Sequence, residues 1–375
     1  MFGTILTAAV TLMHLYVFWR ASTVPVIKRR VPRAVLLAMT AGLWTLFYAG
    51  RVIGHGGSGR AARLLETLGM GWMGVLFLVF VSLLAVDLLT LFGLLFRRFA
   101  PRWRGWAFTV GVLLSVIALV QGNRPPVIET HDVVLHGLPE RIDGTVIVAM
   151  SDLHIGSVLG RDWLAGRIAQ VQAQNPDIVV LVGDIFEGHG IEEDALLPVL
   201  QCLRAPLGVW AVPGNHESHG GSDRGISLMK AAGIQVLSDR WSEVAPGLIL
   251  AGLDDPRRRR RGGQGNDGMA AALANRADGA TILLSHRPLD AGRAAGFGVG
   301  LMLSGHTHGG QIWPLHYPTL LAYPLLSGRY EVKGMTVIVS RGAGTWGPRM
   351  RLWRPGDILR ITLRSATDGP ERSLP

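Results

Sequence analysis

Two histidines lie one residue apart between glycines in the stretch Leu303-Ser304-Gly305-His306-Thr307-His308-Gly309-Gly310-Gln311. The apolar run 299–303 at its start predicts a strand that ends in a turn. Both imidazoles could project from that one loop toward a metal ion. Because a lone His-x-His pair proves little, its meaning depends on the ligands that other strand ends supply.

Short apolar runs recur upstream and alternate with helical patterns. The runs predict buried strands at 145–150, 178–182, 209–212, 248–251, 282–284 and 301–303. The helical patterns fall near 161–174, 191–204, 222–232 and 267–276. This alternation indicates a layered α/β domain, in which ligands gather beyond the carboxyl ends of the strands.

Unusual polar residues follow five of these strands. They are Ser151-Asp152-Leu153-His154, Gly183-Asp184-Ile185-Phe186-Glu187, Pro213-Gly214-Asn215-His216-Glu217, Ser285-His286-Arg287-Pro288 and the histidine stretch itself. One Asp could be a helix cap and one His a core residue, but five successive strand ends predict a shared site. Carboxylate, imidazole and amide ligands without a thiolate suit Mn, Fe or Zn.

Two of these residues invite specific roles. Asp184 is expected to bridge two ions, because a carboxylate has two oxygens and Gly183 allows a close approach. His216 directly follows Asn215. When the amide binds metal, the imidazole is expected to face the phosphate or its leaving group.

In order and type, these blocks resemble the metallophosphoesterase superfamily, also called calcineurin-like phosphoesterases. The matching blocks are Asp152-x-His154, Gly183-Asp184, Gly214-Asn215-His216-Glu217, His286 and Gly305-His306-x-His308, over roughly 145–310. The stretches 304–312 and 340–345 look like the bacterial, membrane-anchored branch, which extends the similarity to 145–363.

The resemblance implies a fold and a ligand set. The fold would be an α/β two-sheet β-sandwich flanked by helices, and the cofactors would be two divalent ions, Mn, Fe, Zn or Mg. One ion would be held by Asp152, His154, Asp184 and His308. The other would be held by Asp184, Asn215, His286 and His306. His216 would be the catalytic or substrate-contacting histidine.

The first third of the chain predicts an α-helical membrane region. With 375 residues, 49% hydrophobic, and a mean hydropathy of +0.31, the chain is too apolar for an ordinary soluble protein. Apolar segments at about 1–19, 33–53, 70–96 and 106–120 approach or exceed the roughly 20 residues that cross a bilayer. A retained first helix is favoured over a signal sequence, because a basic leading region is missing.

The resulting domain plan is a four-span region at 1–120, a linker and domain entry at 121–144, the metallophosphoesterase domain at 145–365 and a flexible tail at 366–375. Basic residues concentrate in the connections 20–33 and 97–104. The positive-inside rule puts both in the cytoplasm. The catalytic domain of a multi-pass protein of the bacterial cytoplasmic membrane would then be extracytoplasmic, although one span more or fewer would invert this.

Several residues outside the metal set leave two interpretations open. Asp87 inside the third span suggests either a functional site or pairing with an arginine. The run 257–261 of five arginines is either a solvated loop or a contact for anionic groups. Asp254 and Asp255 suit an ordinary turn, His189 and His219 ordinary loops, and Cys202 a core position. A pocket rim could be formed by Trp313, Tyr317, Arg341, Trp346, Arg349 and Met350.

These observations predict a membrane-anchored dinuclear-metal phosphoesterase. Metal-bound hydroxide would attack phosphorus, and lipid-linked or cell-envelope phosphoesters are candidate substrates. The alternative enzyme is a UDP-2,3-diacylglucosamine pyrophosphatase of lipid A synthesis, which requires a cytoplasmic domain. The alternatives outside the enzyme class are a membrane transporter and a ligand-binding scaffold.

The expected partners are the lipid bilayer and a phosphoester. Nucleic acid is not expected despite a formal charge of +10, because the basic residues are dispersed and lack a recognition motif. The oligomeric state and the choice among monoester, diester and pyrophosphate remain open in the sequence.

Overall fold

The computed structural model describes residues 2–55, 57, 59–187, 193–217, 224–256 and 267–366. His189, His219, the arginine run 257–261 and the tail from 367 lie outside the described residues. The chain forms two compact units. The helical unit comprises 1–124 with 346–353, and the sheet unit comprises 125–345 with 354–375.

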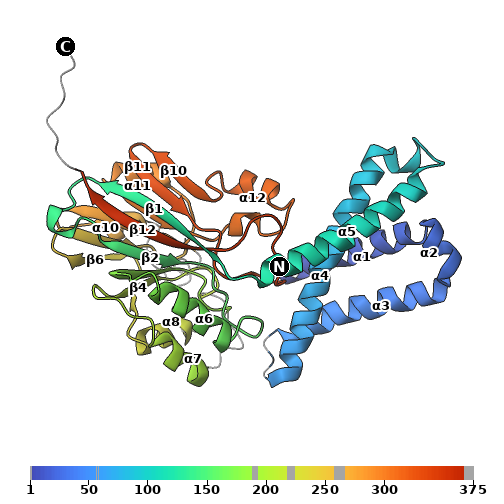
Figure 1. Ribbon diagram of the computed structural model, residues 1–375, viewed down its shortest axis with the longest axis horizontal. Helices are drawn as coiled ribbons and strands as arrows, with labels where there is room; N and C mark the ends of the chain where they lie inside the picture. The colour runs from blue at the N-terminus through green and yellow to red at the C-terminus, as the bar shows by residue number, and fades with distance from the viewer. Residues whose placement is uncertain are drawn as a thin grey trace, which may run out of the picture. The chain divides into compact units, whose positions relative to one another are not determined.

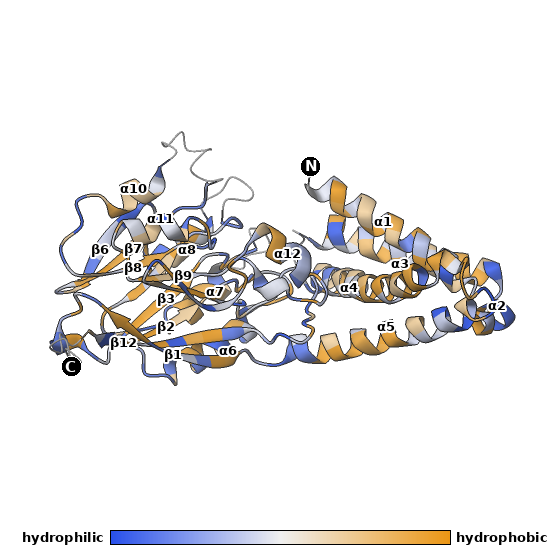
Figure 2. Cartoon of the chain, turned by 90° about the horizontal axis from the view of Figure 1, so that it is seen from above, coloured by the Kyte–Doolittle hydropathy of each residue, from blue (hydrophilic) through white to orange (hydrophobic). Residues whose placement is uncertain are grey.

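Four long helices form most of the helical unit. They are α1 (Phe2–Ala21), α3 (Arg33–Ala49), α4 (Gly59–Leu89) and α5 (Ala100–Asn123), with short helices α2 (Pro25–Arg30) and η2 (Leu91–Gly93) and a π-helical extension η1 (Gly50–Gly54). Four helical segments are long and apolar enough to cross a membrane, namely Gly3–Ala21, Arg33–Gly54, Gly59–Leu89 and Ala100–Asn123. Figure 2 shows the apolar colour along α1, α3, α4 and α5.

The third long helix differs from the segment 70–96 that hydropathy indicates. The helix already begins at Gly59, because polar residues end an apolar run without ending a helix. One of these polar residues, Glu66, is buried, and its Oε1 lies 2.8 Å from His55 Nδ1. The helix stops at Leu89, and Leu91 and Phe92 then take positive φ values that helices do not contain. Hydropathy therefore misses the polar first turns of the helix, and it does not detect the change of backbone conformation after Leu89.

Asp87 is fully buried in the helical unit and is surrounded by partners. Its Oδ1 lies 2.8 Å from Arg104 Nε, and its Oδ2 accepts a hydrogen bond of 2.6 Å from Tyr16 and pairs with Arg20. Two guanidinium groups and a hydroxyl therefore neutralise one carboxylate. Of the two interpretations, this geometry favours the arginine pairing.

The segment 346–353 belongs to the helical unit although it lies far along the chain. The Arg351 amide donates to the Ala118 carbonyl at 2.9 Å, and the Trp353 amide donates to Gln121 Oε1 at 2.8 Å. Met350 is completely buried, and a Cβ placed on Gly74 would collide with its sulfur. The expected role of Met350 in a pocket rim is therefore wrong.

The sheet unit contains two six-stranded sheets (Figure 1). The first has the order β1-β12-β2-β3-β4-β5, with β1 Val127–Leu135, β2 Val146–Met150, β3 Ile178–Val182, β4 Val209–Val212, β5 Gln235–Val236 and β12 Asp357–Ser365. The second has the order β10-β11-β9-β8-β7-β6, with β6 Arg240–Ala245, β7 Leu248–Gly252, β8 Ala280–Leu284, β9 Leu301–Ser304, β10 Gly328–Val332 and β11 Met335–Val339.

Among the described residues, one apolar layer holds the two sheets together and two more join the sheets to helices. Side chains such as Ile147, Val180, Leu250, Ile282 and Leu303 fill the space between the sheets. A second cluster joins the first sheet to α6 (Arg161–Gln172), α7 (Glu193–Leu200) and α8 (Arg224–Ala231), and a third joins the second sheet to α10 (Gly268–Leu273) and α11 (Ala291–Gly296). The expected two-sheet sandwich flanked by helices is confirmed.

The structure adds strands that the sequence patterns did not indicate. β1 lies inside the segment 121–144 expected to be a linker and domain entry, and it pairs in parallel with β12 from Val127 opposite Asp357 to Leu135 opposite Ser365. β1 is an edge strand that keeps polar residues, so its apolar pattern is weak. Cys202 is exposed in a turn after α7, so its expected core position is wrong.

Candidate metal centre

The predicted ligands follow the carboxyl ends of five strands. β2, β3 and β4 run parallel in the first sheet, and β8 and β9 run parallel in the second. Each set therefore delivers its loops to one edge of its sheet. The loops bring together three overlapping groups of metal-ligand type: Asp152, His154 and His308; His154, Asp184 and His216; and Asp184, His286 and His306.

The backbone adopts unusual conformations at five of these residues. Asp152, His154, Asp184, His306 and His308 all have positive φ, between 47° and 69°. This region is uncommon for residues with a Cβ, and such strain concentrates at functional sites. Hydrogen bonds between neighbouring loops hold it, as the amides of Asp152 and His154 donate to the carbonyls of Gly183 and Asp184, each at 3.0 Å.

Two glycines allow the loops to approach closely. A Cβ on Gly305 would collide with the side chains of Ser151 and Asp152, and a Cβ on Gly214 would collide with Asp184. Glycine is therefore required at both positions by space. The carboxylates consequently lie directly against the backbone of the loops that carry the histidines.

The first ligand group lies between β2 and β9. His154 Nε2 is 3.1 Å from His308 Nε2, and His308 Nε2 is 3.5 Å from Asp152 Oδ1. All three side chains are buried. Their ligand atoms are close enough to contact one ion together.

The second ligand group includes Asp184 and two histidines from the other sheet. His286 Nε2 is 3.1 Å from Asp184 Oδ2 and 3.3 Å from His306 Nδ1. The same Asp184 oxygen lies 4.0 Å from His154 Nε2 in the first group. Asp184 therefore lies between the two groups.

The donor chemistry fits divalent cations. Asn215 Oδ1 is buried and has no hydrogen-bond partner within the described parts of the chain. A buried amide oxygen without a partner is costly, and a cation would satisfy it. Together with carboxylates and imidazoles, it makes the mixed set that first-row metals and Mg favour.

Outer partners orient three of the histidines. His154 Nδ1 is 2.6 Å from Glu187 Oε2, His286 Nδ1 is 2.9 Å from the Val182 carbonyl, and His306 Nε2 is 2.8 Å from the Tyr323 hydroxyl. Such contacts fix the ring orientation of a metal-binding histidine. Sequence reasoning gave no role to Glu187 or Tyr323. Glu187 lies in the Asp184 block, which was the available signal, whereas nothing in the sequence singles out Tyr323.

Glu217 is a further residue without an assigned role in the sequence. Its carboxylate accepts hydrogen bonds from the amides of Gly214, Asp184, Ile185 and Phe186, at 2.7 to 3.0 Å. Four amides gathered on one carboxylate fix the loops after β3 and β4 against each other. Its position directly after His216 was the only hint.

The surrounding charges shift the pKa values of two histidines in opposite directions. Burial alone would lower the pKa of His154, but the charges of Glu187 and Asp184 outweigh it and raise that pKa to about 9. Burial and the neighbouring His286 lower the pKa of His306 to about 3. Although burial opposes it, the imidazoles of His286 and His216 hold the pKa of Asp184 well below its usual value.

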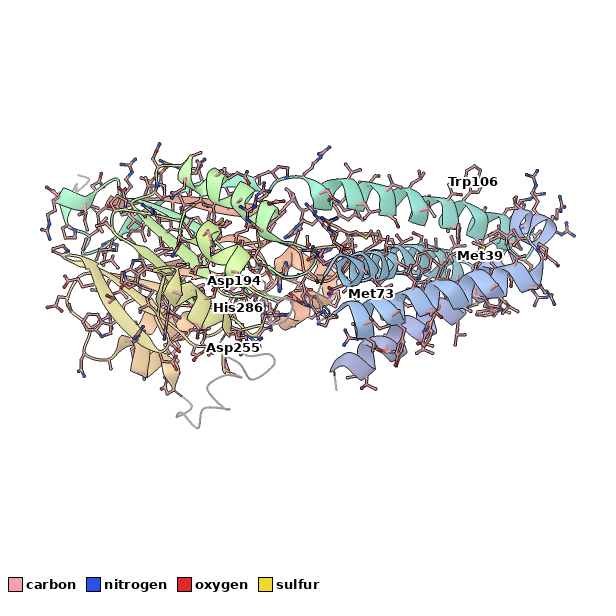
Figure 3. The ribbon with its side chains drawn as sticks, turned by 90° about the horizontal axis from the view of Figure 1, so that it is seen from below. Met39, Met73, Trp106, Asp194, Asp255 and His286 are labelled. Atoms are coloured by element: carbon pink, nitrogen blue, oxygen red, sulfur yellow. The ribbon has the colours of Figure 1, made fainter. Side chains whose placement is uncertain are left out.

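A pocket of about 360 Å³ opens beside His286. Asp255 lines it with His286 (Figure 3), and Asp254 and Arg287 contribute to the same wall. Asp255 is buried, with its Oδ2 2.8 Å from Arg287 Nε. Asp254 and Asp255, which the sequence assigns to an ordinary turn, thus line the same pocket as His286.

Comparison with known proteins finds similarity to metallophosphoesterases. The family model described as calcineurin-like phosphoesterase matches residues 145–310. A Bos taurus transmembrane protein with metallophosphoesterase domain is 34% identical over 276 residues, covering 69% of this chain and 62% of the relative. An uncharacterized metallophosphoesterase from Aquifex aeolicus is 35% identical over 242 residues, covering 63% and 91%.

A third relative, the uncharacterized metallophosphoesterase YkuE of Bacillus subtilis, is 32% identical over 255 residues, covering 64% of this chain and 87% of the relative. The chain spans 62% of the length of the bovine relative, and the same share of a similar Danio rerio protein.

Proposed function

Because the chain belongs to the calcineurin-like phosphoesterase family, we propose that it hydrolyses phosphate esters at a centre that holds two divalent ions. The observation that carries this proposal is the position of Asp184 between two buried ligand groups. Among the described residues, the buried Asn215 oxygen in the next loop has no hydrogen-bond partner. An ordinary core would give such a buried amide oxygen a hydrogen-bond donor.

In this proposal, Asp152, His154, Asp184 and His308 hold one ion, and Asp184, Asn215, His286 and His306 hold the other. Two bound ions of Mn, Fe, Zn or Mg would supply an activated water and neutralise charge on the phosphoryl group. The chain contributes a rigid, buried frame, in which the positive φ values fix where each ligand points.

His216 is the proposed catalytic histidine. Its amide donates to Asp184 Oδ1 at 2.8 Å, and its Nε2 lies 4.0 Å from Asp184 Oδ2. Its Nδ1 is 3.6 Å from Glu187 Oε1, and its ring packs edge-on against His154. In this proposal the ring would contact the phosphate and give a proton to the leaving oxygen.

The helical unit is proposed to be a multi-pass membrane anchor. Four helical segments of sufficient length and the names of the bovine and zebrafish relatives support this. With the basic connections 20–33 and 97–104 in the cytoplasm, the sheet unit would be extracytoplasmic. Lipid-linked or cell-envelope phosphoesters are the substrates that this location favours.

The test uses the full chain in detergent, loaded with Mn²⁺. Its substrates are an aryl phosphomonoester, an aryl phosphodiester, a phospholipid and UDP-2,3-diacylglucosamine. Hydrolysis of at least one ester is expected, with strong loss in Asp184→Asn and His216→Ala. Full rates in both metal-loaded variants, or no hydrolysis by the wild type, would overturn the proposal. A C-terminal reporter that is active only in the cytoplasm would overturn the orientation.

A further inference from the structure

The segment 313–325 presents an exposed apolar surface beside the candidate centre. It contains helix α12 (His316–Ala322) and carries no Asp, Glu, Lys or Arg. Leu321 is 87% exposed and Tyr317 is 59% exposed, and Trp313, Leu315 and Leu320 are also exposed. Scattered apolar residues are normal on a surface, but a contiguous group of this kind marks an interaction site.

The polarity of α12 is the reverse of that of a helix on a soluble domain. Tyr317, Leu320 and Leu321 have the i, i+3, i+4 spacing that puts side chains on one face, and all three are exposed. His316 and Thr319 are only partly exposed, and His316 packs against Gly310. A helix that served only its own domain would bury the apolar stripe and expose the polar one.

The same segment touches the metal centre. It begins five residues after His308, and its Tyr323 hydroxyl lies 2.8 Å from His306 Nε2. The rings of Tyr323 and His306 also meet edge-on, with centroids 5.0 Å apart. A partner bound to the outer face of α12 is therefore held next to a proposed metal ligand.

The chemistry of the surface matches a lipid bilayer. Trp and Tyr combined with Leu is the composition that prefers the membrane interface. Arg354 lies close to the segment, because its Nη1 donates to Ser327 Oγ at 3.0 Å, two residues after Leu325. A guanidinium group there suits anionic headgroups.

Chain connectivity points to the same partner. Only residues 124–126 separate the end of α5 from the start of β1, a path of at most about 14 Å. If α5 crosses a bilayer, as proposed, the sheet unit is tethered to that bilayer by this short connection. The sheet unit then stays close to lipid, a partner that an exposed apolar face of this unit can bind.

We infer that 313–325 is an interfacial surface whose outer side chains insert into the bilayer, and that the adjacent centre takes phosphoesters carried on membrane lipids. The lipid contact stands without the proposed hydrolysis, whereas the substrate class rests on it. This inference extends the proposed function, because it identifies the membrane contact from which a lipid substrate would reach the centre.

Lipid contact is tested by quenching in the full chain, reconstituted in nanodiscs of phosphatidylcholine and phosphatidylglycerol. In a Cys202→Ser background, a bimane probe is attached at Leu321→Cys or, as a control, at Asp162→Cys, whose side chain is 94% exposed on α6. Doxyl-labelled lipid should quench the first probe several-fold more than the second. Equal quenching of the two probes would overturn the inference. It would also be overturned if lipid did not quench the probe at position 321 and only added unlabelled protein changed its fluorescence, because a second copy of the chain would then cover the surface.

The substrate class is tested with Leu320→Glu/Leu321→Glu, which changes two exposed residues of α12. Hydrolysis of a phospholipid in the bilayer should fall about tenfold, because a charge is costly where the apolar face inserts. Hydrolysis of a soluble aryl phosphodiester should not change. The control Val134→Glu alters an exposed apolar residue of β1 and should affect neither rate. Unchanged phospholipid turnover in the double variant would overturn the substrate class. If the wild type hydrolyses neither ester, the proposed function fails while the quenching result stands.

Discussion

Two buried acidic clusters in this chain differ in what completes them. In the helical unit, Asp87 is neutralised by Arg20 and Arg104 and receives a hydrogen bond from Tyr16. In the sheet unit, Asp152 and Asp184 are surrounded by imidazoles, with an unpartnered amide oxygen nearby. Two arginine side chains of the chain itself neutralise the first cluster, which we call the closed cluster. The second, which we call the open cluster, has the donor set that divalent cations bind. Buried carboxylates alone therefore do not indicate function.

The largest expected effect tests the open cluster. Asp184→Asn removes the carboxylate shared by both ligand groups, so hydrolysis should fall at least about 10³-fold. Steady-state rates at saturating Mn²⁺ measure this, with metal content determined by mass spectrometry. If Asp184→Asn were fully active with normal metal content, the cluster around Asp184 would not differ in function from the cluster around Asp87.

The closed cluster should respond in stability. Asp87→Asn leaves two buried guanidinium groups without their carboxylate, and breaking a buried pair costs about 3–5 kcal/mol. Thermal unfolding of the full chain in detergent should show the loss, while the folded fraction keeps its turnover of a soluble ester. The control Asp162→Asn changes an exposed acid and should leave stability unchanged. Lost turnover in folded, metal-loaded Asp87→Asn would instead assign this cluster a functional role.

The two halves of the open cluster should separate. His306→Ala and His308→Ala are each expected to lower affinity for a different ion, by more than the roughly 10–100-fold that outer partners contribute. Metal titration followed by elemental analysis should find about one strongly bound ion in each variant. Equal loss of both ions from each variant would contradict the proposed division of ligands.

The smallest effect concerns an outer partner. Glu187→Gln keeps the shape that contacts His154 but removes the charge, and such changes cost roughly 10–100-fold in metal affinity or activity. Competition with a chelator measures the affinity, and excess metal should restore most of the rate. If excess metal failed to restore the hydrolysis rate of Glu187→Gln, Glu187 would not act only through metal affinity, and its variant would not differ in kind from Asp184→Asn.

The sequence predicts the open cluster better than the closed one, for a physical reason. Ligand loops follow apolar strands that are buried on both faces, so the pattern of β3 or β4 and the residues after it is local and legible. The partners of Asp87 lie 67 residues before it (Arg20) and 17 after it (Arg104), on other helices. Only helix packing reveals that arrangement.

Other features depend on tertiary contact in the same way. β1 becomes a strand by pairing with β12, more than 200 residues away, and its own alternation is weak. Tyr323 reaches His306 because the intervening loop folds back, which no spacing rule predicts. The start of α4 at Gly59 escapes hydropathy because the first turns of that helix are polar.

The course of the chain between β11 and β12 limits how the protein can be divided by an engineer. Gly344 donates its amide to the Asp152 carbonyl at 3.0 Å, yet 346–353 belongs to the helical unit and buries Met350 there. Removal of the residues before 125 would therefore delete Gly74, Ala118 and Gln121, which contact the loop 346–353. This loop would lose its packing partners two residues after Gly344, which contacts Asp152. A soluble version would need that loop shortened or its apolar residues replaced, with the Gly344 contact preserved.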